Sequence, residues 1–231
     1  MSKHSMKKML LILFLSYAFH TQAQEKTLNP YGLKIGTYAE YLDSCKKNSD
    51  NKLLELKKYV PGLVLDIKYA TTDNFMKRVM YKQARAFARR PVVMQLRKIQ
   101  TELKKKGYGL KIFDAYRPYQ VTLAFYAEAS DKNFVANPKK GSKHNRGCAV
   151  DLTLIDLKTR KELVMPTPYD SFAPEASSTY AELPDEVLKN REELISMMRR
   201  HGFRVIPNEW WHFDFMGWQN YDLMDIPFEQ L

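Results

Sequence analysis

The chain has few cysteines, few histidines and no long apolar segment, and each scarcity narrows what it can be. Two cysteines in 231 residues, Cys45 and Cys148, cannot form a disulfide framework, although one bond between them stays open in an oxidising compartment. The apolar run at residues 9–19 is shorter than the ~20 residues that span a bilayer. The five histidines leave few candidates for metal ligation or acid–base chemistry.

What is present indicates one folded domain. Hydrophobic residues make up 45% of the chain and aromatic residues 13%, which is not the composition of a disordered protein. The length suffices for a hydrophobic core, and the sequence has no internal repeat or low-complexity tract. One globular domain is therefore the simplest interpretation.

The first 23 residues have the pattern of a secretory signal. Lys7 and Lys8 precede the apolar run, and "TQAQ" at 21–24 offers small residues for cleavage after Ala23. No cysteine stands at that point, which argues against a lipid anchor; an uncut membrane anchor is the alternative. We expect residues 1–23 to be a signal peptide, and the protein to be secreted, periplasmic and not inserted in the membrane after cleavage.

The remaining chain is basic. The formal charge is +11, and removing the signal with its three lysines and no acid leaves +8. Such a charge favours an anionic neighbourhood. The secretion signal argues against nucleic acid and favours a cell-wall polymer or a membrane surface, although solvated helix faces such as 103–109 explain the charge equally well.

The order of predicted elements is typical of an α+β fold. Residues 24–60 have the character of a peripheral lead-in, and 61–231 form the main folded domain. We expect a single domain with a central antiparallel sheet flanked by helices. The predicted strands are 63–75, 108–118, 148–157, 203–206 and 209–215, the predicted helices are 91–107, 119–130 and 184–202, and 131–143 and 165–178 are loops.

One carboxylate stands in an unusual place. In "SKHNRGCAVDLTL" (142–154), Asp151 lies within an apolar strand pattern, seven residues after His144. A carboxylate there is costly to bury unless a metal, an arginine or backbone donors accompany it. A hydrogen-bonded His–Asp pair is the structural alternative to a metal site.

A second stretch, "NEWWHFDF" (208–215), supplies Glu209 and His212. In an ideal strand these two side chains would face opposite sides, so both reach one site only if Glu209 lies on the bend after Pro207. The other three histidines are not candidates for this site, because two lie in the signal and His201 suits a helix C-terminus.

These residues match the ligand types of a catalytic zinc site. Two imidazoles and one carboxylate, from His144, Asp151 and His212, leave the fourth position to water. Glu209 is then placed to take a proton from that water. Cys148 is excluded as a ligand because it faces away from Asp151 in the predicted strand.

The same stretches carry a family resemblance. "SKHNRGCAVDLTL" fits SxHxxGxAxDL, and with "EWWHF" and "FDAYRP" (113–118) the chain resembles the D-alanyl-D-alanine dipeptidases, the VanX-like branch of the zinc D,D-peptidases. "DIKYATTDNF" (66–75), "PTPYDSF" (166–172) and "NR" (190–191) match in the same order. The resemblance spans roughly residues 60–215 and implies the zinc D,D-peptidase, or hedgehog-like, fold.

The resemblance also implies a role for each residue. One zinc ion would be held by His144, Asp151 and His212, with Glu209 as general base. Arg117 would stabilise the oxyanion of the tetrahedral intermediate. Asp170 would pair with the free ammonium of a small D,D-dipeptide, and Ser142 and Tyr69 would line the substrate site.

Each of these roles has a structural alternative. Arg117 could serve an ion pair, Asp170 could cap a turn, Tyr69 could belong to the core, and Asp114 has the character of a structural residue. Asn145 and Cys148 stand where the family commonly has serine, and the stretch between Arg117 and Ser142 is short, which puts strict dipeptide selectivity in question.

The implied function is zinc-dependent hydrolysis of D-Ala-D-Ala-type dipeptides in peptidoglycan turnover or wall-fragment recycling. Two alternatives remain open at this point. One is a D,D- or L,D-carboxypeptidase that acts on longer wall peptides. The other is a non-enzymatic, secreted wall-binding module with a structural metal, although such a metal normally has four protein ligands.

Overall fold

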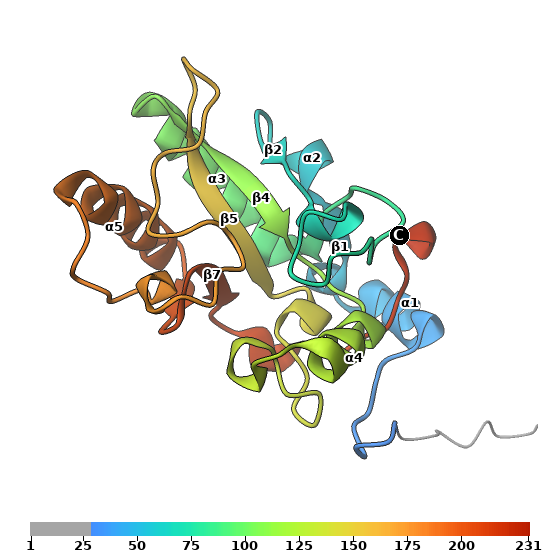
Figure 1. The fold of residues 1–231 in the computed structure, drawn as a ribbon. Helices are drawn as coiled ribbons and strands as arrows, with labels where there is room; N and C mark the ends of the chain where they lie inside the picture. Colours follow the sequence, from blue (N-terminus) through green and yellow to red (C-terminus); the bar gives the residue numbers. More distant parts are fainter. Residues whose placement is uncertain (1–28) are drawn as a thin grey trace, which may run out of the picture.

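A five-stranded sheet organises the molecule. The computed structural model describes residues 29–231, so the predicted signal segment lies outside the described residues. Figure 1 shows the central strands side by side, with helices around them. The strand order is β2-β4-β5-β7-β6, and every neighbouring pair is antiparallel except β2 with β4. The strands are β2 (Val64–Leu65), β4 (Tyr108–Asp114), β5 (Ala149–Asp156), β6 (Phe203–Ile206) and β7 (Glu209–Phe215).

The structure corrects the first predicted strand. Only Val64 and Leu65 of residues 63–75 form a strand, and that strand runs parallel to β4. The chain then leaves the sheet in the 3₁₀ turn η2 (Lys68–Ala70), where Tyr69 is almost fully buried. The sequence does alternate apolar residues here. However, the 3₁₀ turn buries Tyr69, the last of them, without extending the hydrogen-bonded pairing of β2 with β4.

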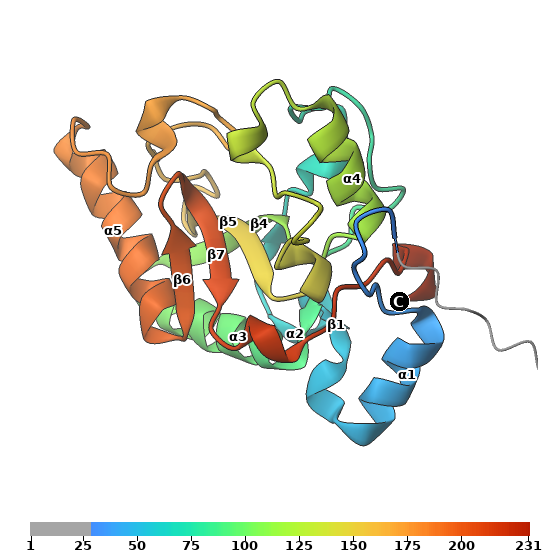
Figure 2. The same ribbon diagram turned by 90° about the horizontal axis from the view of Figure 1, so that it is seen from below.

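Two long helices cover one face of the sheet, as Figure 2 shows for α3 beneath the strands. They are α3 (Arg90–Lys105) and α5 (Asp185–Arg200), close to the predicted ranges. Pro91 lies in the first turn of α3, where its missing N–H has no intrahelical partner to lose, and glycines with positive φ, Gly107 and Gly202, follow the two helices. Their apolar faces share one core with alternate residues of β5, namely Val150, Leu152 and Leu154.

The segment before residue 60 also contributes to this core. It holds α1 (Tyr38–Lys47), β1 (Leu53–Glu55) and α2 (Leu56–Tyr59), and β1 pairs with β3 (Phe87–Arg89). Leu56 and Val60 are completely buried, so this end of the predicted peripheral lead-in is not peripheral. The domain boundary at residue 60 stays a prediction.

The opposite face of the sheet carries α4 (Tyr119–Glu128), on the far side of the sheet from α3 in Figure 2, and a set of irregular segments. The 3₁₀ turns are η1 (Ser49–Asn51), η2, η3 (Lys132–Phe134), η4 (His144–Arg146), η5 (Pro174–Ala176), η6 (Trp218–Asn220) and η7 (Phe228–Gln230). Cys45 and Cys148 are both free thiols. Within residues 29–231, no helix combines the length and apolar character needed to cross a bilayer.

Candidate active site

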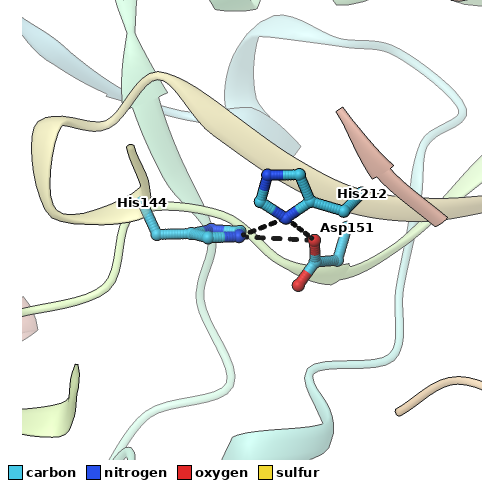
Figure 3. Close-up of side chains that lie close together, drawn as sticks. All are labelled: His144, Asp151 and His212. Carbon is cyan, nitrogen blue, oxygen red and sulfur yellow. Dashed lines mark hydrogen bonds and ion pairs between the residues drawn. The ribbon is translucent and has the colours of Figure 1, made fainter. Parts of the chain in front are cut away.

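Three side chains converge on the face of the sheet that α3 and α5 leave uncovered. Asp151 on β5 stands directly opposite His212 on β7, so the antiparallel register places both side chains on one face. His144 reaches the same point from η4, just before β5. Figure 3 shows the three side chains pointing at one another. His144 Nε2 lies 3.2 Å from His212 Nδ1, and the three ligand atoms all lie within 4.8 Å of each other.

The far nitrogen of each imidazole is held by a fixed acceptor. His144 Nδ1 lies 2.6 Å from the carbonyl oxygen of Ala115, and His212 Nε2 lies 2.9 Å from Asp214 Oδ1. Since a carbonyl and a carboxylate only accept, each of these nitrogens carries the hydrogen. When the rings are neutral, as metal ligation requires, their lone pairs therefore lie on His144 Nε2 and His212 Nδ1, as in metal sites whose ligands are oriented by an outer layer of partners.

Asp151 contributes an oxygen that suits a cation. Its Oδ2 accepts a hydrogen bond from the Tyr169 hydroxyl at 2.9 Å, whereas Oδ1 is buried and accepts none. Oδ1 lies 3.0 Å from His212 Nδ1 and 3.3 Å from His144 Nε2. Two lone pairs and one anionic oxygen repel one another unless a positive charge lies between them. The residues present therefore fit a divalent metal ion.

The electrostatics of the three ligands agree with that fit. Burial would raise the pKa of Asp151, but the two histidines outweigh it and hold the pKa below its usual range. Burial would likewise lower the pKa of His212, but the Asp151 and Asp214 carboxylates raise it to about 10. The negative potential that holds a proton so tightly is equally favourable to a metal cation.

Glu209 reaches the same pocket through an irregular pairing of β6 and β7. The register shifts so that Val205 faces Phe213 while the next residue, Ile206, faces Glu209. This bulge, rather than the bend after Pro207 alone, brings Glu209 Oε2 to 3.7 Å from His212 Nδ1. Burial raises the pKa of Glu209 to about 7, against the opposing effect of His212. Such a carboxylate can both take up and release a proton near neutral pH.

Arg117 is fixed by a carboxylate that the sequence interpretation treated only as structural. Its Nε and Nη2 both donate to Asp114 Oδ2, at 2.9 Å and 2.7 Å, and the guanidinium lies over the Phe125 ring. Nη2 also lies 3.8 Å from Asp151 Oδ2. Burial opposes its charge, but Asp114 outweighs that effect and holds the pKa of Arg117 well above its usual value. The group stays charged beside the ligand set.

Asp170, Tyr69 and Ser142 line the same cavity of about 210 Å³, together with the three ligands, Glu209 and Arg117. The Tyr69 hydroxyl donates to Asp170 Oδ2 at 2.7 Å, and Ser142 Oγ accepts from the His144 amide at 3.2 Å. Burial raises the pKa of Asp170 well above its usual value, although the Tyr69 hydrogen bond partly offsets this. Asp170 has a positive φ of 60°, a conformation that aspartate tolerates better than most residues.

Sequence reasoning missed Asp214, Tyr169 and the role of Asp114 in holding Arg117. Asp214 lies two residues after His212 on β7, so the two-residue period of a strand puts both on one face and signals the contact. Asp114 ends β4 and Arg117 follows three residues later, a spacing that by itself does not predict the contact. Tyr169 comes from a distant loop, and no pattern in the sequence links it to Asp151. His201 is an ordinary C-cap of α5, as predicted, and its Nε2 contacts Glu102.

Comparisons with known proteins agree on one family. A family model described as D-ala-D-ala dipeptidase matches residues 49–228. The chain is 32% identical to the D-alanyl-D-alanine dipeptidase of Escherichia coli (strain K12), over 75% of this chain and 89% of the relative. It is 29% identical to the D-alanyl-D-alanine dipeptidase of Enterococcus faecalis, over 78% of this chain and 95% of the relative. A third D-alanyl-D-alanine dipeptidase, from Streptomyces coelicolor, is 30% identical over 67% of this chain and 86% of its own. With a family model that spans most of its length and relatives aligned along nearly their whole chains, this chain belongs to the D-ala-D-ala dipeptidase family of peptidases.

Proposed function

We propose that the protein hydrolyses D-Ala-D-Ala-type dipeptides with one zinc ion held by His144, Asp151 and His212. The observation that carries this proposal is the convergence of two imidazole lone pairs on the unbonded Asp151 Oδ1, with Glu209 at 3.7 Å from His212. Three protein ligands leave a position for water or substrate, which is the mark of a catalytic rather than a structural zinc site.

Glu209 performs the proton transfers in this mechanism. A zinc ion, when bound, supplies Lewis acidity and lowers the pKa of water. Glu209 accepts the proton of the attacking water and then donates it to the amine that leaves. In the metal-free protein, burial raises the pKa of Glu209 to about 7, so its surroundings favour the uptake of a proton more than those of an exposed glutamate do.

Arg117 stabilises the negative charge that develops on the substrate carbonyl oxygen. The hydrogen bonds to Asp114 fix the plane of the guanidinium before substrate arrives, so no reorganisation is needed during the reaction. A permanently charged fork in a buried site is better suited to this task than a lysine.

Asp170 selects substrates with a free amine. Its carboxyl is buried and its pKa is raised, so the group is costly to ionise until a cation arrives. The ammonium of a dipeptide supplies that cation, and the Tyr69 hydroxyl holds the carboxyl in place. Longer peptides, whose corresponding nitrogen is a neutral amide, supply no cation to pair with the ionised carboxylate.

The predicted signal segment supports a secreted, periplasmic location, where wall fragments rather than new precursor supply the dipeptide. On that reading the reaction belongs to peptidoglycan turnover or fragment recycling. The net charge of +8 after signal removal favours association with an anionic wall polymer, which stays a prediction.

One assay tests the proposal. The purified, zinc-loaded protein is incubated with D-Ala-D-Ala, N-acetyl-D-Ala-D-Ala and L-Ala-L-Ala, and free alanine is followed. We expect release from the free D,D-dipeptide only. Release from the acetylated compound as well would favour a carboxypeptidase, and no release from any of them with zinc bound would favour a wall-binding module.

A further inference from the structure

A dipeptide carries charge at both ends, and the proposed function accounts for only one of them. Asp170 takes the ammonium, but the terminal carboxylate also needs a partner in a cavity of about 210 Å³. A buried carboxylate without a cation or hydrogen-bond donors is strongly unfavourable. Among the described residues that line this cavity, the arginine and lysine side chains are Arg117 and Lys143.

Arg117 is committed elsewhere. It is 7% exposed, two of its donors bind Asp114, and it lies beside Asp151 where the scissile carbonyl must approach the ligands. A guanidinium in that place serves the reacting carbonyl. It cannot at the same time hold a carboxylate one residue further along the substrate.

Lys143 is placed on the other side of the ligand set. Its Nζ lies 3.3 Å from Asp214 Oδ2, and Asp214 in turn holds His212. Asp170 is reached through different contacts, since Tyr69 holds it and Tyr169 joins that region to Asp151. Asp170 and Lys143 therefore lie on different sides of the three ligands, Asp170 on the side of Asp151 and Lys143 on the side of His212.

The ammonium of Lys143 is held only weakly. Its side chain is 39% exposed, its ion pair with Asp214 is partly solvated, and its other recorded contact is the Trp218 ring, with Nζ 5.4 Å from the centroid. Partly exposed ion pairs contribute about 0–1 kcal/mol. A substrate carboxylate can replace that contact at little cost, while Asp214 Oδ1 keeps its bond to His212.

We propose that Lys143 binds the terminal carboxylate of the substrate and so sets its length and direction in the cavity. This inference rests on the proposed function and deepens it. Asp170 and Lys143 both line this cavity, so it offers an anion and a cation to the two charges of a zwitterionic dipeptide. A substrate that lacks the free carboxylate loses this contact and binds less tightly.

The test compares D-Ala-D-Ala with its C-terminal amide, which lacks only the negative charge. For the natural protein we expect kcat/KM to favour the acid by about ten-fold or more, the value of one charge-assisted hydrogen bond. Lys143→Met reduces this preference roughly ten-fold, mainly through KM. Lys143→Arg retains most of it, because the charge is kept.

Two controls separate substrate binding from a structural role. Lys140→Met removes an exposed lysine three residues earlier and leaves the preference unchanged. Zinc content is measured for each variant, because Lys143 acting only through Asp214 and His212 would change metal binding instead. Equal losses for acid and amide in Lys143→Met would overturn the inference.

A binding measurement distinguishes this inference from the proposed function. D-Ala-D-Ala is titrated calorimetrically into zinc-loaded Glu209→Gln protein, with and without Lys143→Met. Binding that weakens about ten-fold on loss of Lys143 supports the contact even if the natural protein turns nothing over. Turnover by the natural protein with unchanged affinity on loss of Lys143 rejects the inference alone, and absence of both binding and turnover rejects both.

Discussion

Two parts of the cavity bury charge in opposite ways. One is the ligand set, His144, Asp151 and His212, and the other is the substrate side, with Glu209 and Asp170. On the ligand side, His144, Asp151 and His212 each have a second atom held by a fixed partner, and their side chains are 10% exposed or less. On the substrate side, burial raises the pKa values of Glu209 and Asp170, and their partners offset this only in part. Fixed partners suit a site that must hold a metal, whereas partly compensated carboxyls suit groups that exchange protons or await a cation.

The sharpest way to separate the two sides is to remove one carboxylate from each. Glu209→Gln should lower kcat by about 10²–10⁴-fold, because the proton acceptor is lost, while zinc stays bound. Asp151→Asn should instead abolish zinc binding, because a neutral amide replaces the charged ligand. Zinc content and kcat are measured on both proteins.

Near-normal turnover by Glu209→Gln would show that Glu209 is not the general base. The proposed difference between the ligand side and the substrate side would then be wrong. Loss of zinc from that same variant would have a similar meaning, since Glu209 would then belong to the ligand set.

The next effect concerns the partners behind the ligands. Asp214→Asn should weaken zinc affinity by about 10–100-fold, because a neutral amide is a weaker acceptor for His212 Nε2 and can present its NH2 group instead, so the tautomer and orientation of the ring are no longer fixed. Competition with a chelator of known affinity gives the dissociation constant. Asp185→Asn, which changes an exposed aspartate at the start of α5, is the matched control. Natural zinc affinity in Asp214→Asn would show that the ligand side does not depend on its outer partners.

The ligand set was the most predictable part of the site. His144 and Asp151 lie seven residues apart on one continuous segment, and the apolar neighbours of Asp151 identify it as a buried carboxylate in a strand. The long helices were also predictable, because apolar periodicity and the punctuation by Pro91, Gly107 and Gly202 are local properties.

The sequence could predict the position of Glu209 only conditionally, because its contact with His212 requires an irregularity in the strand. Whether it shares a face with His212 depends on the register shift between β6 and β7, and register is decided by pairing rather than by either strand alone. The parallel pairing of β2 and the burial of Leu56 depend on contacts distant in sequence for the same reason. Tyr69 was placed on a strand because a single 3₁₀ turn preserves the same pattern of buried residues.

The smallest expected effect is on stability. It tests whether the cost of burying the Glu209 carboxylate is left largely uncompensated in the folded protein. Folding raises the pKa of Glu209 from 4.5 to about 7, so its favourable contribution is complete below pH 4.5 and is lost as the pH rises through 7. Glu209→Gln removes the ionisable group. In metal-free protein with chelator, its free energy of unfolding should exceed that of the natural protein by about 2 kcal/mol at pH 8 and by much less at pH 5. Urea titrations at both pH values measure the difference, and Glu186→Gln, an exposed change in the first turn of α5, should show no such pH dependence. An equal effect at pH 5 and pH 8 would mean that Glu209 is already compensated in the folded protein, as the ligands are.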